Sequence, residues 1–318
     1  MISQEDLFNR YSLERSTYEK ATSNWSKLSE IFDHYVGLNI QLGHHETLVA
    51  SLLQEVPVVH SVKSRLKDPE HLIAKLITKS DLDAINENNY RKEVTDLIGL
   101  RALHLFKDDW IQIHRFIKDT WRLKQKPTAN VRIGDSEAAL QKFKSEGCKI
   151  RFHPAGYRSV HYLITSRINK ETAIAEIQVR TIFEEGWSEI DHTIRYPYNL
   201  YNDAINQYLV IFNRLAGSAD EMGTFIRYLQ THFENREAER HLLLSEVNQL
   251  KMRIDQMSIK TEEKNIIKSG IEDLNKLASS PTLLGQALQT FSQGSLISRD
   301  VDLLKQAFPQ KRPKKQKT

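Results

Sequence analysis

The chain has 318 residues, enough for one sizeable domain with an appendage or for two small domains. Its composition, 40% hydrophobic and 27% charged, is ordinary for a soluble globular protein, and no apolar run reaches the roughly 18 residues of a transmembrane helix. The first residues lack a secretory signal, and the single cysteine, Cys148, can form neither an internal disulfide nor a Cys-rich zinc site. We therefore expect a cytoplasmic protein without a membrane partner.

The formal net charge is +4, and part of this excess lies in a basic tail at residues 309–318. A basic tail can contact nucleic acid or an anionic surface, although it is more often a solvated end that aids solubility. The charge balance thus leaves an RNA such as tRNA open as a partner and says little about the core.

The first part of the chain, residues 1–54, is predicted to be a helical segment. Apolar residues between positions 7 and 35 recur mostly at steps of three, four and seven, the spacing of one helix face. Gly37 and Gly43 are expected to interrupt this helix. A further helix is predicted over 46–54, and Pro57 follows its end.

Strands and helices then interleave over residues 55–200. Strands are predicted at 58–62, 97–106, 149–152, 158–164 and 173–180, and helices at 69–79, 109–123 and 182–194. Asp68 before Pro69 marks the start of the first of these helices. The order predicts an α+β domain, a mixed β-sheet flanked by helices.

Residues 201–308 are predicted to be an all-helical C-terminal extension. A short seam typical of a coiled coil runs through Leu243, Val247, Leu250, Ile254 and Met257. Because it lasts about two heptads, it fits packing back onto the domain and formation of a homo-oligomer equally well. The segment 279–281 is expected to break the helix.

Two acidic residues stand beside or within apolar strands. Asp96 immediately precedes the strand at 97–106, and Glu176 lies within the strand at 173–180. Carboxylates in such places are costly unless they are paired or bind a cation. Two that converge from neighbouring strands suit Mg²⁺, although a salt bridge with Arg101 or Arg180 explains either acid about as well.

Basic residues cluster near the same strands. They are Lys63, Arg65, Lys67 and Lys75 around one strand–helix junction, and Arg101, Arg158 and Arg180 on or beside other strands. Strand alternation would place Lys63, Arg65 and Lys67 on one face. Such a cluster suits a polyphosphate, and taken alone it also fits a solvated basic surface.

The segment Gly156–His161, with the sequence GYRSVH, places an aromatic ring directly after a glycine turn. Gly156 permits a tight turn, and Tyr157 can stack on a base. Arg158 and His161 are potential partners of phosphate or hydroxyl groups. Taken alone, Tyr157 also fits a half-buried core aromatic.

In this order, five motifs resemble the RelA/SpoT synthetase domain over about residues 55–200. They are SVKSRLK from Ser61, DLIGLR from Asp96, GYRSVH from Gly156, EIQVRT from Glu176, and the stretch from Trp187 to His192. No hydrolase region is visible ahead of them and no regulatory domain behind them. The chain is thus similar to a small alarmone synthetase or to a toxin-type relative.

The resemblance implies a nucleotidyltransferase-like synthetase domain that transfers the β,γ-pyrophosphate of ATP to the 3′-hydroxyl of GDP or GTP, giving (p)ppGpp. By motif position it implies that Asp96 and Glu176 hold Mg²⁺. It further implies that Glu176 or Gln178 orients the acceptor ribose. No Walker loop is present, so ATP should not be bound as in a P-loop enzyme.

The same resemblance assigns the nucleotide-binding residues. On the ATP side, it implies Arg65 and Arg101 around the adenine and Lys67 and Lys75 at the phosphates. On the acceptor side, it implies that Tyr157 stacks on the guanine. It also implies that the acceptor nucleotide is bound by Arg158, His161, Arg180 and His192.

Some departures from the family pattern leave the acceptor open. The loop before Gly156 is less basic than in many synthetases, and Asp191 and Thr193 replace residues that are commonly Glu and Lys. A toxin-type relative that pyrophosphorylates tRNA 3′ ends or adenosine nucleotides is therefore an alternative. An inactive nucleotide-binding module is a third, which the presence of both Asp96 and Glu176 disfavours.

Overall fold

The computed structural model describes residues 1–195, 203–256, 261, 265 and 269. The chain divides into two units, Met1–Asp220 and Glu221–Thr318. In the first unit, one hydrophobic core joins buried side chains of the N-terminal helices to those of the sheet. The long helix α9, Asp203–Gln256, begins in the first unit and ends in the second. No helix among the described residues is long and apolar enough to span a membrane.

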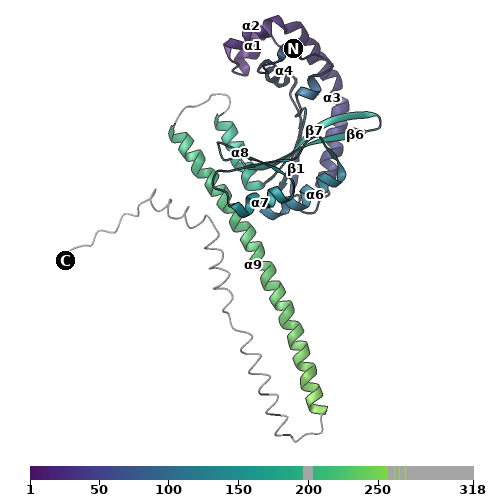
Figure 1. Cartoon of the computed structure of the whole chain (residues 1–318), viewed down its shortest axis with the longest axis vertical. Coiled ribbons are helices and arrows are strands. Elements are labelled where there is room, and N and C mark those ends of the chain that lie inside the picture. The colour runs from purple at the N-terminus through teal and green to yellow at the C-terminus, as the bar shows by residue number, and fades with distance from the viewer. Residues whose placement is uncertain (196–202, 257–260, 262–264, 266–268, 270–318) are drawn as a thin grey trace, which may run out of the picture. The chain divides into compact units, whose positions relative to one another are not determined.

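The N-terminal helices include one long helix, α3, where the sequence predicted an interruption. The helices up to the second strand are α1 (Gln4–Arg10), α2 (Tyr18–Ser23), α3 (Trp25–Gln54), α4 (Pro69–Ile77) and α5 (Tyr90–Glu93), with short 3₁₀ turns at Arg15–Thr17 and Leu82–Ala84. The predicted break at Gly37 and Gly43 is wrong, because α3 runs through both (Figure 1). A glycine costs a helix interior about 1 kcal/mol, and side chains buried along α3, such as Leu28, Tyr35 and Leu53, offset that cost.

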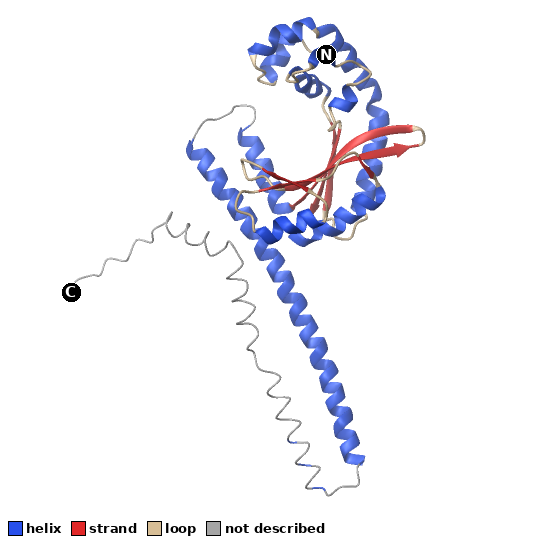
Figure 2. Cartoon of the chain, viewed as in Figure 1, coloured by secondary structure: helices blue, strands red, loops and turns tan. Residues whose placement is uncertain are grey.

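The sheet has seven strands and is mixed (Figure 2). The strands are β1 (Ser61–Leu66), β2 (Ile98–His104), β3 (Arg122–Leu123), β4 (Thr128–Val131), β5 (Lys149–Phe152), β6 (Ser159–Ile168) and β7 (Glu171–Thr181). Their order is β1-β2-β7-β6-β4-β5, and β3 pairs with β6. The pairs β2–β7 and β4–β5 are parallel, and the others are antiparallel. The predicted α+β fold with a mixed sheet is confirmed.

Helices α3 and α6 (Trp110–Thr120) cover one face of the sheet. His45 on α3 lies 2.9 Å from the Ser166 hydroxyl, and His114 on α6 lies 2.9 Å from the Tyr162 hydroxyl. Both partners point to the same face of β6 because they are separated by an even number of residues. The opposite face, which carries Lys63, Arg101, Gln178 and His161, is called the polar face below.

Some elements differ from the sequence prediction. The first strand covers 61–66 rather than 58–62, because Val59 packs into the core ahead of the strand while the polar residues that follow pair with β2. The strands β3 and β4, the helix α7 (Glu137–Ser145) and the 3₁₀ turn Lys107–Asp109 were not predicted. The helix predicted at 182–194 is confirmed as α8, Ile182–Arg195. The part of the predicted seam from 243 to 254 falls on α9, whereas Met257, the segment 279–281 and the tail 309–318 lie outside the described residues.

Candidate active site

A row of polar residues crosses four strands on the polar face. Lys63 on β1 is in register with Arg101 on β2, Arg101 with Gln178 on β7, and Gln178 with His161 on β6. Side chains in register on neighbouring strands point to the same face, so the sheet itself brings these four together. Glu176 lies two residues before Gln178 on β7 and therefore points to the same face.

Glu176 is held in a hydrogen-bonded network with the residues of the row. Its Oε1 lies 2.9 Å from Nδ1 of His161, and Nε2 of Gln178 donates to its Oε2 at 3.2 Å. The Tyr157 hydroxyl lies 3.1 Å from Nε2 of His161 and donates to Oε1 of Gln178 at 3.2 Å. Burial would raise the pKa of Glu176, but the bonds from His161 and Gln178 outweigh it and leave the pKa below its usual value.

Asp96 lies just before β2 and is paired with two lysines. Nζ of Lys67 is 2.9 Å from Oδ2, and Nζ of Lys75 on α4 is 2.9 Å from Oδ1. Burial would raise the pKa of Asp96, but these two ion pairs lower it overall. The salt bridges considered from the sequence, with Arg101 or Arg180, are formed by neither acid, because both arginines pair with a carboxylate on α8.

Lys67 differs from the exposed basic residue that its position in the sequence indicated. It follows β1 rather than continuing it, and it is 6% exposed. Burial lowers the pKa of its ammonium group, and Asp96 opposes that shift. A lysine held in this way lies where a phosphate could take over from the carboxylate.

The two acids fit a divalent cation. The charge of Asp96 tends to raise the pKa of Glu176, so the two carboxylates are close enough to interact. Their side chains are 22% and 21% exposed, and both pKa values lie below normal, so both are ionised and reachable. In the described parts of the chain, no three or more acidic, His or Cys side chains are grouped so that they could hold a metal ion by themselves. A pair of carboxylates completed by substrate oxygens is the arrangement that Mg²⁺ commonly uses.

A carboxylate on α8, Glu185, joins cations from three strands and was missed by the sequence analysis. Its Oε1 lies 2.9 Å from Nζ of Lys63 and 3.1 Å from Nη1 of Arg101, and its Oε2 lies 3.1 Å from Nε of Arg180. It is 4% exposed. Burial would raise its pKa, but the three cations outweigh that effect and lower it. Glu189, one turn later, also contacts Arg101.

Comparison with known proteins identifies the segment that carries these residues. Residues 64–201 match the family model described as a region found in RelA/SpoT proteins. The chain carries a RelA/SpoT-family synthetase domain. GTP pyrophosphokinase YwaC of Bacillus subtilis is 28% identical over 155 residues, which are 48% of this chain and 63% of that protein. The chain therefore spans less than two thirds of the length of this relative.

Solved structures similar to this chain include several from bacteria. A GTP pyrophosphokinase family protein from Streptococcus pneumoniae is 21% identical with a TM-score of 0.42, covering 69% of this chain and 97% of that one. The small alarmone synthetase 1 from Bacillus subtilis is 18% identical with a TM-score of 0.42, covering 66% and 98%. The same synthetase bound to its product pppGpp gives 20% identity and a TM-score of 0.40, covering 66% and 99%.

Within the RelA/SpoT-family domain, most of the residues predicted for the site lie on or beside the polar face. Arg65 is exposed on β1 in register with Gly99, one row from Arg101. Arg180 is buried, donates to Oε1 of Gln178 at 2.7 Å, and places its guanidinium 5.3 Å from the centroid of the Tyr157 ring. Burial raises the pKa of the Tyr157 hydroxyl.

Arg158 lies apart from this row, whereas His192 follows Glu185 by seven residues on α8. The guanidinium of Arg158 forms an ion pair with Asp135, including an Nε–Oδ2 bond of 3.1 Å, and another with Glu184 at 3.1 Å. These partners hold Arg158 in the protein interior rather than on the polar face. His192 is exposed in the last turn of α8. Strand alternation did not predict the position of Arg158, because that residue precedes β6 and lies in the loop.

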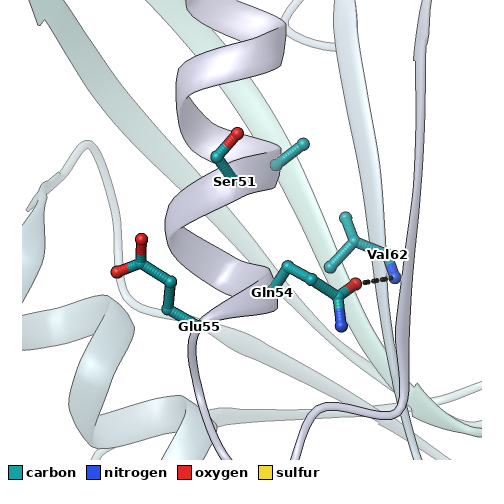
Figure 3. A pocket seen from close by; sticks show the side chains of 5 residues that line it. Ser51, Gln54, Glu55 and Val62 are labelled. Carbon is teal, nitrogen blue, oxygen red and sulfur yellow. Dashed lines mark hydrogen bonds between the residues drawn. The ribbon is translucent and has the colours of Figure 1, made fainter.

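A shallow hollow elsewhere offers little for chemistry. It is lined by Ala50, Ser51, Gln54, Glu55 and Val62, at the end of α3 and on β1 (Figure 3). Oε1 of Gln54 accepts a hydrogen bond from the Val62 amide at 3.1 Å. None of the residues predicted for the site lines it. The polar face is therefore the candidate active site of the RelA/SpoT-family domain.

Proposed function

We propose that the protein transfers the β,γ-pyrophosphate of ATP to the 3′-hydroxyl of GDP or GTP and so makes (p)ppGpp. The observation that supports this function best is that cations from β1 and β2 share one face of a RelA/SpoT-family domain with Glu176, whose pKa also responds to the charge of Asp96 just before β2. Both substrates are polyanions, and such a reaction depends on positioning and charge neutralisation rather than on covalent catalysis.

On the donor side, the lysines around Asp96 receive the phosphates of ATP. Lys67 and Lys75 each contact one oxygen of Asp96, so both charges are already in place and the three groups together keep a net charge of +1. Arg65 and Arg101 lie on adjacent strands and offer planar guanidinium groups to the adenine. The bond that forms joins the acceptor 3′-oxygen to the β-phosphorus, and AMP leaves with the oxygen that bridged the α- and β-phosphates.

On the acceptor side, the Glu176 network holds the nucleoside. The Tyr157 ring stacks on the guanine, and His161 and Gln178 fix the hydroxyl of that ring. Because the pKa of Glu176 is lowered, its carboxylate is ionised and accepts a hydrogen bond from the acceptor 3′-hydroxyl. His161, bonded to the same carboxylate, holds it in that orientation.

Asp96 and Glu176 would hold Mg²⁺ at this site. When bound, the ion supplies charge neutralisation at the donor phosphates and makes the acceptor hydroxyl more acidic. The two carboxylates fit this role because both are ionised and reachable.

The test is transfer of label from γ-³²P-ATP, in the presence of Mg²⁺, to each of GDP, GTP, AMP and uncharged tRNA. We expect GDP or GTP to acquire the label and Glu176→Gln to slow the transfer about 10²- to 10³-fold. Label that appears in tRNA or AMP alone would contradict the proposal and support the toxin-type alternative. If the folded wild-type protein labels none of the four, it does not catalyse this reaction.

A further inference from the structure

The first turns of α9 are built into the catalytic unit although they lie beyond residue 201, where the family match ends. Leu209, Asn213, Ala216 and Asp220 are each at most 6% exposed. Their spacing of three and four places them on one side of the helix. The Leu209 carbonyl accepts a hydrogen bond from the Trp187 indole at 3.1 Å, and Asp220 accepts one from the Thr181 hydroxyl at 2.8 Å.

The side chain of Asn213 holds the glycine before Tyr157. Nδ2 of Asn213 donates to the Gly156 carbonyl at 3.1 Å, and Oδ1 lies 3.5 Å from Nη1 of Arg132. Gly156 has a φ of +74°, which favours glycine, and a Cβ there would lie 2.9 Å from Oδ1 of Asn213. The loop and the helix therefore fit each other only while position 156 is glycine and its carbonyl points to α9.

One turn later, α9 supports the residue after Tyr157. A Cβ on Gly217 would lie 2.5 Å from Nη1 of Arg158, so the missing side chain leaves room for the guanidinium. Arg158 is fixed on its other sides by Asp135 and Glu184. Position 213 thus bonds to the backbone before Tyr157, and position 217, on the same side of α9, lies against the side chain of the residue after it.

We propose that Asn213 is a positioning residue for the acceptor nucleotide and that the first turns of α9 set acceptor recognition by fixing the Tyr157 ring. This inference rests on the proposed function, in which Tyr157 stacks on the acceptor base. A ring fixed in its stacking orientation before binding loses less freedom when the nucleotide arrives. Among the described residues, the ion-pair partners of the donor residues Lys67, Lys75 and Arg101 are Asp96, just before β2, and two carboxylates on α8, and none of these lies on α9. Removal of the Asn213 contact should therefore weaken binding of the acceptor and leave binding of ATP unchanged.

The experiment compares Asn213→Ala with Arg214→Ala in the full-length protein. Arg214 is the next residue on the same helix and is exposed, so its removal controls for substitution in α9. We expect Asn213→Ala to raise the KM for GDP or GTP about three- to tenfold, the size of effect of one lost hydrogen bond. The KM for ATP should change less than twofold, and Arg214→Ala should change neither. Equal changes in both KM values, or no change in either, would overturn the inference.

A second readout separates this inference from the proposed reaction. Amide hydrogen exchange over residues 153–158 should be faster in Asn213→Ala than in Arg214→Ala, because the amide of Gly156 donates to the His153 carbonyl within this loop. If exchange increases but the wild-type protein transfers no pyrophosphate, the proposed function has failed and the positioning contact stands. Unchanged exchange refutes the positioning role whatever the activity.

Asn213→Asp provides a variant of the same shape if the alanine variant does not fold. The aspartate keeps an oxygen toward Arg132 and loses the donor to the Gly156 carbonyl. It should raise the acceptor KM and the exchange rate in the same direction. A fully folded Asn213→Asp with wild-type values for both would contradict the inference.

Discussion

Two clusters of charged side chains lie on the first unit, one on the polar face and one in the interior. In the first, the side chains of Asp96 and Glu176 are 22% and 21% exposed. In the second, which we call the buried cluster, the side chains of Asp135, Arg158 and Glu184 are 11%, 13% and 4% exposed, and Asp220 is fully buried. A ligand can reach the first cluster, whereas the second is closed by the protein itself.

The acids of the two clusters also differ in charge state. Their partners keep the pKa values of Asp96 and Glu176 low, so both remain ionised. In the buried cluster, burial raises the pKa of Glu184, and burial together with the neighbouring Glu184 raises that of Asp220 to about 7. The first cluster thus keeps its charges available for a ligand. The second, by its contacts with Thr181 and the Gly156–Arg158 loop, fastens α9 to the sheet.

The largest expected effect comes from removing a charge on the polar face. Glu176→Gln keeps the shape of the side chain and loses its charge, so we expect kcat to fall about 10²- to 10³-fold with the fold intact. Glu171→Gln, at the exposed start of the same strand, is the matched control and should retain full activity. Rates of pyrophosphate transfer and thermal unfolding would measure both. A Glu176→Gln enzyme with more than a tenth of wild-type kcat would contradict the assigned role.

Two of the carboxylates of α8, Glu185 and Glu189, offer a comparison within the polar-face cluster. Glu185→Ala leaves Lys63, Arg101 and Arg180 without their shared buried partner, and we expect the free energy of unfolding to fall by about 3 kcal/mol. Glu189 is 49% exposed and contacts Arg101, so Glu189→Ala should cost about 0–1 kcal/mol. Denaturant titration gives both values. Equal losses in the two variants would show that Glu185 does not connect the three strands.

The ring of Tyr157 can be separated from its hydroxyl. Tyr157→Ala removes the stacking surface and should raise the acceptor KM about 10- to 100-fold, the size expected for base–aromatic stacking. Tyr157→Phe keeps the ring and loses the contacts to His161 and Gln178, so its effect should be about threefold. Steady-state kinetics with varied acceptor at saturating ATP checks both. A larger effect from Phe than from Ala would exclude stacking as the main role.

In the buried cluster, titration of Asp220 should make the free energy of unfolding depend on pH. The folded pKa of Asp220, about 7, lies above its ordinary value of 3.8, so stability from this group is greatest at low pH and is lost as pH rises toward 7. Asp220→Asn removes this titration and can still accept from Thr181. The wild type loses this stability between about pH 3.8 and pH 7, so we expect the free energy of unfolding of Asp220→Asn, relative to the wild type, to rise by about 3 kcal/mol between pH 5 and pH 8. A difference that does not grow between these pH values would contradict a protonated Asp220.

The sequence predicted the parts of this site that depend on local pattern and order. The strands carrying Arg101, His161 and Glu176 were placed correctly because apolar residues alternate or run together there. The break predicted at Gly37 and Gly43 was wrong because burial of side chains against the rest of the protein decides whether a long helix continues. Glu185 was missed because a helical acid gives no sign of burial until the helix is placed on the sheet.

The contact of Asn213 with Gly156 could not be predicted from the sequence either. The two residues are 57 positions apart, and the bond runs from a side chain to a backbone carbonyl, which leaves no pattern in residue type. Lys67 was grouped with Lys63 and Arg65 on one strand face, which also fitted a solvated surface, but β1 ends at Leu66 and Lys67 is buried. Such errors arise where the three-dimensional neighbour, and not the local sequence, decides the environment.

The most direct test of the central claim is the chemical identity of the product made from ATP and GDP. The account predicts AMP in equal amount to a guanosine nucleotide that carries a diphosphate on its 3′-oxygen as well as on its 5′-oxygen, with ³¹P resonances of the new group coupled to H3′. Formation of ADP, or extension of the 5′ chain, would show that a different bond is made and would contradict the account.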